Sequence, residues 1–166
     1  MINKLFLSLG SNIEPKLSYL TEAIRLLNAE FDFVSASAVY RTAPVDYTAQ
    51  EDFYNLCAEY ETDNDDPFVV FEIIKGIEKK IGREKTFDKG PRKIDIDIII
   101  FGEHSVNSEA LNIPHREFLN RRFVLEPLME LLPEDSEYIK KYDLVNRLNS
   151  IGSQPVIKIG ELKIDK

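Results

Sequence analysis

Hydrophobic residues along the first hundred positions switch between the two-residue period of strands and the three-to-four-residue period of helices. Strand patterns, rich in β-branched and aromatic residues, occur at residues 5–9, 33–41, 53–60 and 94–101. A helix is expected from Pro15 onward, because one apolar stripe contains Leu17, Leu20, Ile24 and Leu27. With a second helix before the last strand, the order β-α-β-β-α-β fits the split βαβ, ferredoxin-like arrangement, with helices on one face of an antiparallel sheet. We expect the open face to be available for ligands.

The second helix has the clearest boundaries in the chain. Asp66 suits the N-cap, Pro67 suits the first helical position, and Gly82 suits a left-handed C-terminal stop. Gly76 inside the helix costs about 1 kcal/mol relative to alanine, which is too little to cancel the apolar face. That face consists of Val70, Ile73, Ile74, Ile77 and Ile81.

Beyond residue 101 the periodicity is weaker. We expect a short apolar pair around Val106, an irregular connection at residues 111–115, a helical region near residues 127–132 and a β-hairpin at residues 156–164. No internal repeat, linker or low-complexity segment divides the chain, so we expect one domain over residues 1–166.

The strand at residues 94–101 carries charge that packing alone does not require. Because side chains alternate along a strand, Asp95 and Asp97 share one face, about 7 Å apart. A strand that is apolar on both sides at its end is typical of the centre of a sheet, so we expect the carboxylates at the rim of a core. The opposite face would contain Ile94, Ile96, Ile98 and Ile100, and the face of the aspartates would continue with Ile99 and Phe101.

Two interpretations of these carboxylates are open. In the first they hold Mg²⁺, which typically takes one or two protein carboxylates and completes its shell with water and substrate phosphates. Arg92, just upstream, could then bind the phosphate. In the second they lie on a solvated strand face and pair with Arg92 and Lys93. The spacing D-x-D does not decide between them.

Composition and charge narrow the functional classes. A hydrophobic fraction of 43% and a charged fraction of 30% are typical of a soluble globular protein, and the net charge of −8 argues against a general nucleic-acid-binding surface. Two local basic clusters could hold a polyphosphate or form solvated loops: Arg83, Lys85, Lys89, Arg92 and Lys93, and His115, Arg116, Arg121 and Arg122. Neither G-x-x-x-x-G-K-[ST] nor G-x-G-x-x-G occurs, so side chains and metal must bind any nucleotide. Phosphoryl or nucleotidyl transfer is the chemistry that this combination suggests.

The cysteine count and the apolar runs indicate a compartment. The single Cys57 excludes an intramolecular disulfide and a cysteine-based zinc site, and its apolar surroundings indicate a buried structural thiol. The N-terminal apolar run is interrupted by Gly10-Ser11-Asn12, and no stretch is long enough to span a bilayer. We therefore expect a cytoplasmic protein that binds neither nucleic acid nor a membrane.

One motif is long enough to compare with a known family. The segment Gly90-Pro91-Arg92-x-x-Asp95-Ile96-Asp97-Ile98-Ile99 resembles the signature of the 6-hydroxymethyl-7,8-dihydropterin pyrophosphokinases. Further landmarks in the same order are Gly10-Ser11-Asn12, Tyr40-Arg41-Thr42-x-Pro44, Phe53-Tyr54-Asn55, Ile113-Pro114-His115 and Asn120-Arg121-x-Phe123-x-Leu125-x-Pro127-Leu128. Only the C-terminal segment lies outside the resemblance.

The resemblance implies a function, a fold and a set of site residues. Such enzymes transfer pyrophosphate from ATP to the hydroxymethyl group of the pterin and release AMP in folate biosynthesis. The implied fold is an α+β, ferredoxin-like, three-layer α/β/α sandwich with an antiparallel-dominated sheet. Asp95 and Asp97 would hold two Mg²⁺ ions, and together with Arg92 they are the catalytic candidates. No obligate protein partner is implied.

The substrate-binding candidates carry over from the same resemblance. The loops at residues 42–52 and 83–93 are long and polar and lie beside the expected site, which makes them candidate lids that close over ATP and the pterin. ATP would be bound by Glu78, Arg83, Lys85, Arg92, Ile98, His115 and Arg121. The pterin would be bound by Thr42, Pro44, Val45, Phe53, Asn55 and Phe123, with the two phenylalanine rings stacking on it and Asn55 bonding its amide-like edge.

Three other classes would explain part of the pattern. A ferredoxin-like binding module could bind metal or nucleotide without chemistry. A two-metal nucleotidyltransferase would release pyrophosphate in place of AMP. A purely structural protein would leave the two carboxylates and the arginine-bearing segments unexplained. AMP release is the observation that separates them.

Overall fold

The structure is a computed structural model that describes residues 1–44, 48–84, 87–152 and 154–164. Its elements in chain order are β1 (Asn3–Ser11), α1 (Lys16–Glu30), β2 (Asp32–Ala36), β3 (Val39–Thr42), β4 (Phe53–Thr62), α2 (Pro67–Ile81), β5 (Asp95–Phe101), β6 (Val106–Asn107), β7 (Asn112–Ile113), the 3₁₀ helix η1 (Phe118–Asn120), α3 (Arg122–Leu131), α4 (Glu137–Lys141), α5 (Leu144–Ser150) and β8 (Val156–Gly160).

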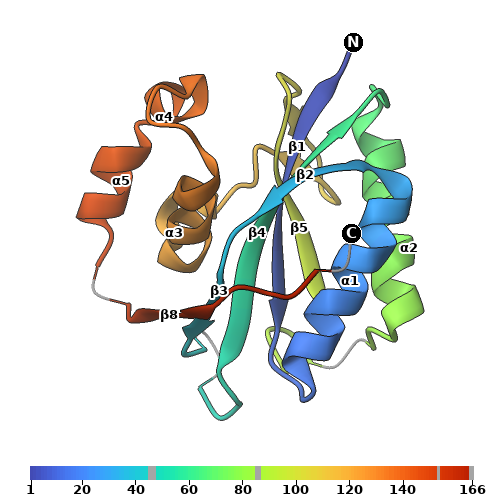
Figure 1. The fold of residues 1–166 in the computed structure, drawn as a ribbon, viewed down its shortest axis with the longest axis vertical. Coiled ribbons are helices and arrows are strands. Elements are labelled where there is room, and N and C mark those ends of the chain that lie inside the picture. Colours follow the sequence, from blue (N-terminus) through green and yellow to red (C-terminus); the bar gives the residue numbers. More distant parts are fainter. Residues whose placement is uncertain (45–47, 85–86, 153, 165–166) are drawn as a thin grey trace.

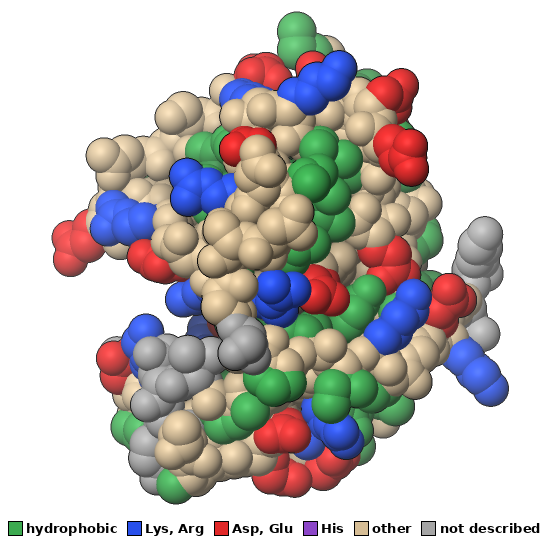
Figure 2. All heavy atoms as spheres, turned by 90° about the vertical axis from the view of Figure 1, so that its left-hand side faces the viewer, with side chains coloured by type: hydrophobic (Ala, Val, Ile, Leu, Met, Phe, Trp, Pro, Cys, Tyr) green, Lys and Arg blue, Asp and Glu red, His purple; other side chains and the backbone are tan. Residues whose placement is uncertain are grey.

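An antiparallel sheet forms the middle of three layers (Figure 1). Its strand order is β5-β1-β4-β3-β8, and β2 pairs with the far part of β4. Helices α1 and α2 cover one face, and α3, α4 and α5 cover part of the other. Viewed from the side of the second group, the molecular surface is cut by a deep notch (Figure 2). The α+β, three-layer fold is therefore confirmed, whereas the expectation of helices on one face only is wrong.

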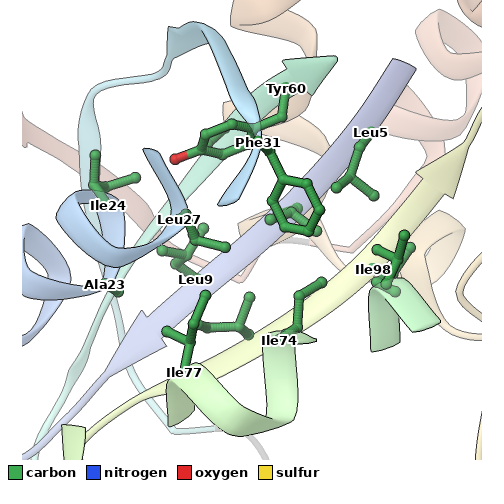
Figure 3. Close-up of a cluster of buried hydrophobic side chains, with 14 of the residues drawn as sticks. Leu5, Leu9, Ala23, Ile24, Leu27, Phe31, Tyr60, Ile74, Ile77 and Ile98 are labelled. Carbon is green, nitrogen blue, oxygen red and sulfur yellow. The ribbon is translucent and has the colours of Figure 1, made fainter. Parts of the chain in front are cut away.

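Alternation along β1 builds both cores. Leu5, Leu7 and Leu9 point toward α1 and α2 and are completely buried there (Figure 3). Phe6, between them, points the other way, into a cluster with Leu125 and Leu128 of α3. Burying apolar side chains on both faces stabilises a sheet that one helical layer alone would leave half exposed.

The predicted boundaries of α2 are confirmed. The Asp66 carboxylate accepts a hydrogen bond from the Phe68 backbone N–H at 2.9 Å, Pro67 begins the helix, and Gly82 ends it with φ +96°. In α1, by contrast, Leu17 is 47% exposed and does not belong to the buried stripe. The rest of that stripe is buried as expected.

The strand expected at residues 33–41 is divided into β2 and β3. The Ser37 side chain accepts a hydrogen bond from the Cys57 backbone N–H at 2.9 Å, and a Glu130 carboxylate oxygen accepts one from the Ala38 N–H at 3.0 Å. Residue 37 keeps one strand-to-strand bond, from its own N–H to the Cys57 carbonyl at 2.8 Å, and at residue 38 the Glu130 side chain takes the place of a strand partner. Cys57 itself is completely buried, and burial raises the pKa of its thiol, in agreement with a structural role.

Two expectations for the C-terminal third are wrong. Helix α3 begins at Arg122, five residues before the expected start at Pro127, and runs through that buried proline. The hairpin at residues 156–164 does not form, because β8 pairs with β3 instead of folding back on itself. Helices α4 and α5 were not anticipated. Among the described residues, no helix combines the length and apolar character that crossing a bilayer needs.

Strand β5 differs from its predicted form in two ways. It lies at the edge of the main sheet, not at its centre. Its pairing with β1 also skips Ile99, since Phe6 lies opposite Ile100 and Leu7 opposite Ile98. Beyond this bulge Ile100 points toward the α3 core, as Ile99 does, and Phe101 points toward the α1–α2 core, so the predicted alternation holds through Ile99 and ends there.

Candidate active site

A cleft of about 1200 Å³ opens on the sheet face that α3 partly covers, over the part of that face that the helix leaves uncovered. Its opening is the notch of Figure 2, and Lys and Arg side chains lie at its edge. The predicted residues that line it are Thr42, Pro44, Phe53, Asn55, Arg83, Arg92, Asp95, Asp97, His115, Arg121 and Phe123. Val45 and Lys85 lie outside the described residues, and Glu78 and Ile98 lie outside the cleft.

One transverse row of the sheet brings the two predicted ligand sets together. Gly10 of β1 pairs with Asp95 of β5 on one side and with Asn55 of β4 on the other. Adjacent strands are about 4.8 Å apart, so the candidate metal ligand and the candidate pterin ligand are separated by roughly 10 Å across the glycine. Two substrates bound on this face would meet above Gly10.

The absence of a side chain at Gly10 is required by its neighbours. A Cβ atom there would lie 2.8 Å from Oδ1 of Asn55 and 3.7 Å from the Phe53 ring. The first distance is shorter than real Cβ contacts allow, so a larger residue would displace the Asn55 amide. This gives a physical reason for the glycine in the landmark Gly10-Ser11-Asn12.

Arginines surround the first of the two carboxylates. Asp95 lies 3.4 Å from a guanidinium nitrogen of Arg83 and 3.5 Å from one of Arg92. The alternative interpretation also expected Lys93 to pair with these carboxylates. In the part of the chain that the structure describes, the ion pairs found for Asp95 are with Arg83 and Arg92 instead. The pairing with Arg92 agrees with both interpretations, so the position of the residues in a cleft, not the pairing, favours a binding site.

Asp97 is the less compensated carboxylate. Although 33% of its side-chain surface is open to the cleft, burial of the remainder and the neighbouring Asp95 raise the pKa of Asp97 to about 7. A carboxylate held in this way gains stability when a cation binds next to it. Asp95 and Asp97 therefore fit a divalent cation, although no cluster of three or more His, Cys, Asp or Glu ligands occurs among the described residues. Two carboxylates suffice for Mg²⁺ where substrate phosphates and water supply the other ligands.

Glu78 supports this site from behind. Its side chain is 2% exposed, and Oε2 accepts a hydrogen bond from the Ile96 backbone N–H at 2.8 Å, between the two aspartates. Oε1 lies 2.8 Å from the Lys75 ammonium and 3.7 Å from Arg83. Glu78 thus provides a hydrogen-bond acceptor for a backbone N–H of the edge strand β5 and forms an ion pair with Arg83, one of the cleft arginines. Glu78 does not itself line the cleft.

His115 faces Asp97 across the cleft in a defined tautomer. Its Nδ1 accepts a hydrogen bond from the Glu117 backbone N–H at 3.1 Å, so the neutral ring carries its proton on Nε2. That atom points toward Asp97 at 3.9 Å, too far for a hydrogen bond. Burial and the nearby Arg121 lower the pKa of His115, so the ring is neutral at pH 7 and offers one N–H donor to the cleft.

The pterin candidates form the opposite end of the cleft. Asn55 is 4% exposed, and its Nδ2 donates a hydrogen bond to the Thr42 hydroxyl at 2.7 Å. This bond orients the carboxamide, whose oxygen points toward Gly10. The guanidinium of Arg92 lies 5.1 Å from the centre of the Phe53 ring, and that of Arg121 lies 5.7 Å from the Phe123 ring. A planar cationic group therefore already lies over one face of each ring.

Asn12 connects the two loops that border the cleft, and its role was not anticipated. The side chain is 1% exposed; Nδ2 donates to the Gln50 amide oxygen at 2.8 Å and to the Glu51 carbonyl at 3.2 Å, while Oδ1 accepts from the Arg92 N–H at 2.9 Å. A buried asparagine in a turn looks like a local turn residue in the sequence. Only the pairing of distant segments shows that it joins the loops at residues 42–52 and 83–93.

Ile98 lines a smaller adjacent pocket instead of the main cleft. This pocket shares Asp97 and His115 with the cleft and is otherwise formed by α2, β5 and the segment around β7. Lys75 and Arg116 add positive charge to it. The main cleft and this pocket together form a continuous surface across the two shared residues.

Comparisons with known proteins agree with this geometry. Residues 6–133 match the family model of 7,8-dihydro-6-hydroxymethylpterin-pyrophosphokinase (HPPK). The chain is 41% identical to the bifunctional protein FolKE of Lactococcus lactis subsp. cremoris over 80% of its own length and 38% of that protein. It is 37% identical to the 2-amino-4-hydroxy-6-hydroxymethyldihydropteridine pyrophosphokinase of Bacillus subtilis, over 79% of each chain.

Solved structures show the same fold at lower identity. An HPPK-DHPS protein crystallised with substrates superposes with a TM-score of 0.68 over 89% of this chain and 42% of that one, at 16% identity. The chain spans less than half the length of the first relatives that it matches, Lactococcus FolKE (38%) and the Pneumocystis carinii folic acid synthesis protein (17%). With the family model covering most of the chain, this protein belongs to the HPPK family.

Proposed function

We propose that the chain transfers pyrophosphate from ATP to the hydroxymethyl group of 6-hydroxymethyl-7,8-dihydropterin, with AMP as the second product. Membership of the HPPK family and the named B. subtilis relative support this proposal. The observation that carries it is the row Asp95–Gly10–Asn55, which puts the candidate phosphate end and the candidate pterin end of one cleft side by side.

The pterin is assigned to the end formed by Thr42, Phe53, Asn55 and Phe123. Flat heteroaromatic rings bind well between aromatic side chains, and the fixed Asn55 carboxamide offers a hydrogen-bonding edge. Arg92 and Arg121, which contact the two rings, would exchange this contact for phosphate oxygens when ATP binds. The triphosphate is assigned to the end at Arg83, Arg92, His115 and Arg121, and the base to the pocket at Ile98.

Asp95 and Asp97 are the proposed ligands of Mg²⁺. When bound there, Mg²⁺ would neutralise phosphate charge and help to align the reacting groups. In the transfer itself, the pterin hydroxyl oxygen forms a bond to the β-phosphorus while the bond from that phosphorus to the α,β-bridging oxygen breaks. The hydroxyl proton leaves to solvent or to Asp97. Arg83, Arg92 and the Nε2–H of His115 stabilise the charge that develops on the phosphates.

A direct assay tests the proposal. Purified protein is incubated with ATP and MgCl₂, with and without 6-hydroxymethyl-7,8-dihydropterin, and AMP and pyrophosphate are quantified. We expect pterin-dependent AMP, and loss of at least ~10³-fold in turnover for Asp97→Ala with pterin affinity changed by less than about threefold. Normal turnover of that variant would remove the metal-site assignment. Release of pyrophosphate in place of AMP would identify a nucleotidyltransferase, and binding of both ligands without either product would identify a binding module.

A further inference from the structure

The C-terminal segment at residues 144–160 lies outside the match to the family model, which ends at residue 133. It includes α5, which lies beside α3, and β8, which lies beside β3 (Figure 1). Each of these elements is attached to a different wall of the cleft.

The first attachment is to the start of α3. Arg122 donates hydrogen bonds from Nη2 to the backbone carbonyls of Leu148 at 2.9 Å and Ile151 at 3.2 Å. These carbonyls belong to the last turn and the end of α5, which Arg122 therefore caps. Since Arg122 stands between Arg121 and Phe123, which both line the cleft, the end of α5 positions that wall.

The second attachment is to β3. Strand β8 pairs with β3 in antiparallel register, with Val156 opposite Thr42. Two register positions further in, where Lys158 lies opposite Tyr40, the Lys158 ammonium is 3.8 Å from Glu130, whose carboxylate also accepts a 2.6 Å hydrogen bond from the Tyr40 hydroxyl. Backbone pairing and this polar group hold the strand that ends at Thr42.

Gln154 lies between the two attachments and lines the cleft itself. Its Nε2 donates a hydrogen bond to the Ala43 carbonyl at 3.3 Å. Ala43 stands between Thr42 and Pro44, two of the predicted pterin residues. The side chain thus ties the turn after β3 to the segment that also holds the start of α3.

We propose that the described parts of this segment, residues 144–152 and 154–160, act as a strap that sets the distance between the two pterin walls of the cleft, with Gln154 as a positioning residue. The strap acts through three contacts. The Gln154 side chain bonds to the Ala43 carbonyl, β8 pairs with the strand that ends at Thr42, and carbonyls at the end of α5 accept hydrogen bonds from Arg122. This inference rests on the assignment of the pterin to that end of the cleft. It predicts that losing the Gln154 bond loosens pterin binding selectively, because that bond holds Ala43, between two predicted pterin residues, whereas the wall of Arg121 is held separately through Arg122.

The test compares Gln154→Met with a matched control, Asn149→Ala. Methionine keeps the length of glutamine but has no N–H to donate, and Asn149 is an exposed amide of the same segment, on α5, away from the cleft. For Gln154→Met we expect KM for the pterin to rise about three- to tenfold, the effect of one lost hydrogen bond, while KM for ATP and kcat stay within about twofold. Asn149→Ala should match the wild type in all three constants.

A measurement without turnover separates this inference from the proposed function. Hydrogen exchange of the Thr42 and Ala43 amides should be faster in Gln154→Met than in the wild type and in Asn149→Ala, at an unchanged unfolding temperature. If the wild-type protein releases no AMP in response to the pterin, the proposed function is overturned, and the exchange result alone then tests the strap. The strap is overturned if exchange at Thr42 and Ala43 is unchanged, or if an active Gln154→Met enzyme has a wild-type KM for the pterin. A parallel rise of both KM values together with a lower unfolding temperature would also overturn it.

Discussion

The two ends of a single sheet face differ in almost every property, although the same three strands run through both. At the end that α3 to α5 cover, β1 contributes Phe6, β4 contributes Cys57, and β5 contributes Ile99 and Ile100. At the open end the same strands contribute Gly10, Asn55 and the pair Asp95 and Asp97. One end is thus a packed core, and the other is a polar cleft.

The difference shows how a helical layer of limited length creates a site. Apolar side chains at the covered end fasten α3 to the sheet, and α3 stops before it reaches the polar end. The residues at its start, Arg121 and Phe123, then line the cleft. The core therefore fixes the position of one cleft wall without contributing a ligand, which makes stability and substrate affinity separable.

Removing a ring from the covered end should give the largest effect on stability. Phe6 is 1% exposed, and its ring packs edge-on against Tyr138 at 5.4 Å. Phe6→Ala is expected to lower the free energy of unfolding by ~3–5 kcal/mol, because it removes buried surface and leaves a cavity. Urea titration measures this loss. Below the unfolding transition, KM for both substrates should stay within about twofold; a large change in affinity would show that the two ends are not separable.

Adding a single methyl group at the open end should have the converse effect, a loss of substrate affinity. Gly10→Ala places a Cβ against the Asn55 carboxamide oxygen, so we expect pterin affinity to fall about 10- to 100-fold with a smaller change for ATP. Gly76→Ala is the matched control, since a Cβ there meets nothing within 4 Å and α2 should become more stable by about 0.5–1 kcal/mol. Calorimetric titration with the pterin distinguishes them, and equal affinities of Gly10→Ala and wild type would contradict the close approach.

The smallest expected effect is the pH dependence that Asp97 gives to stability. Its pKa rises from an ordinary 3.8 to about 7, so the folded protein binds this proton more tightly than the unfolded chain. Between these values stability falls as pH rises, and the loss is complete above about pH 7. In EDTA, Asp97→Asn should therefore unfold about 2–4 °C higher than the wild type at pH 8, a modest shift because the cleft is partly open to solvent.

Thermal unfolding at several pH values measures that difference. The advantage of Asp97→Asn should shrink steadily from pH 8 to pH 5, since the wild-type carboxyl is then protonated too. A difference that stays constant over this range would mean that the charge of Asp97 is already compensated in the folded protein. Addition of MgCl₂ at pH 8 should stabilise the wild type more than the variant, by mass action on a site that the variant has weakened.

Local chemistry alone determined much of this protein. The capped helix α2, the centre of β1 and the charged strand β5 follow from neighbouring residues, because capping and side-chain alternation act over a few positions. Strand β1 itself runs from Asn3 to Ser11, two residues further at each end than predicted, and so includes Gly10 and Ser11 of the expected turn. The motif around Asp95 and Asp97 and its companion landmarks predicted eleven residues that meet in one cleft, from Thr42 to Phe123. The family that they resemble is the family to which the chain belongs.

Tertiary structure alone decided how those residues meet. The bulge at Ile99, the edge position of β5 and the division at Ser37 and Ala38 depend on pairing with distant strands, which no local period encodes. The contacts of Asn12 and Gln154 with loops far away in sequence are of the same kind. Long-range register chose which face each side chain occupies, and this choice, more than residue type, made one end of the face a core and the other a site.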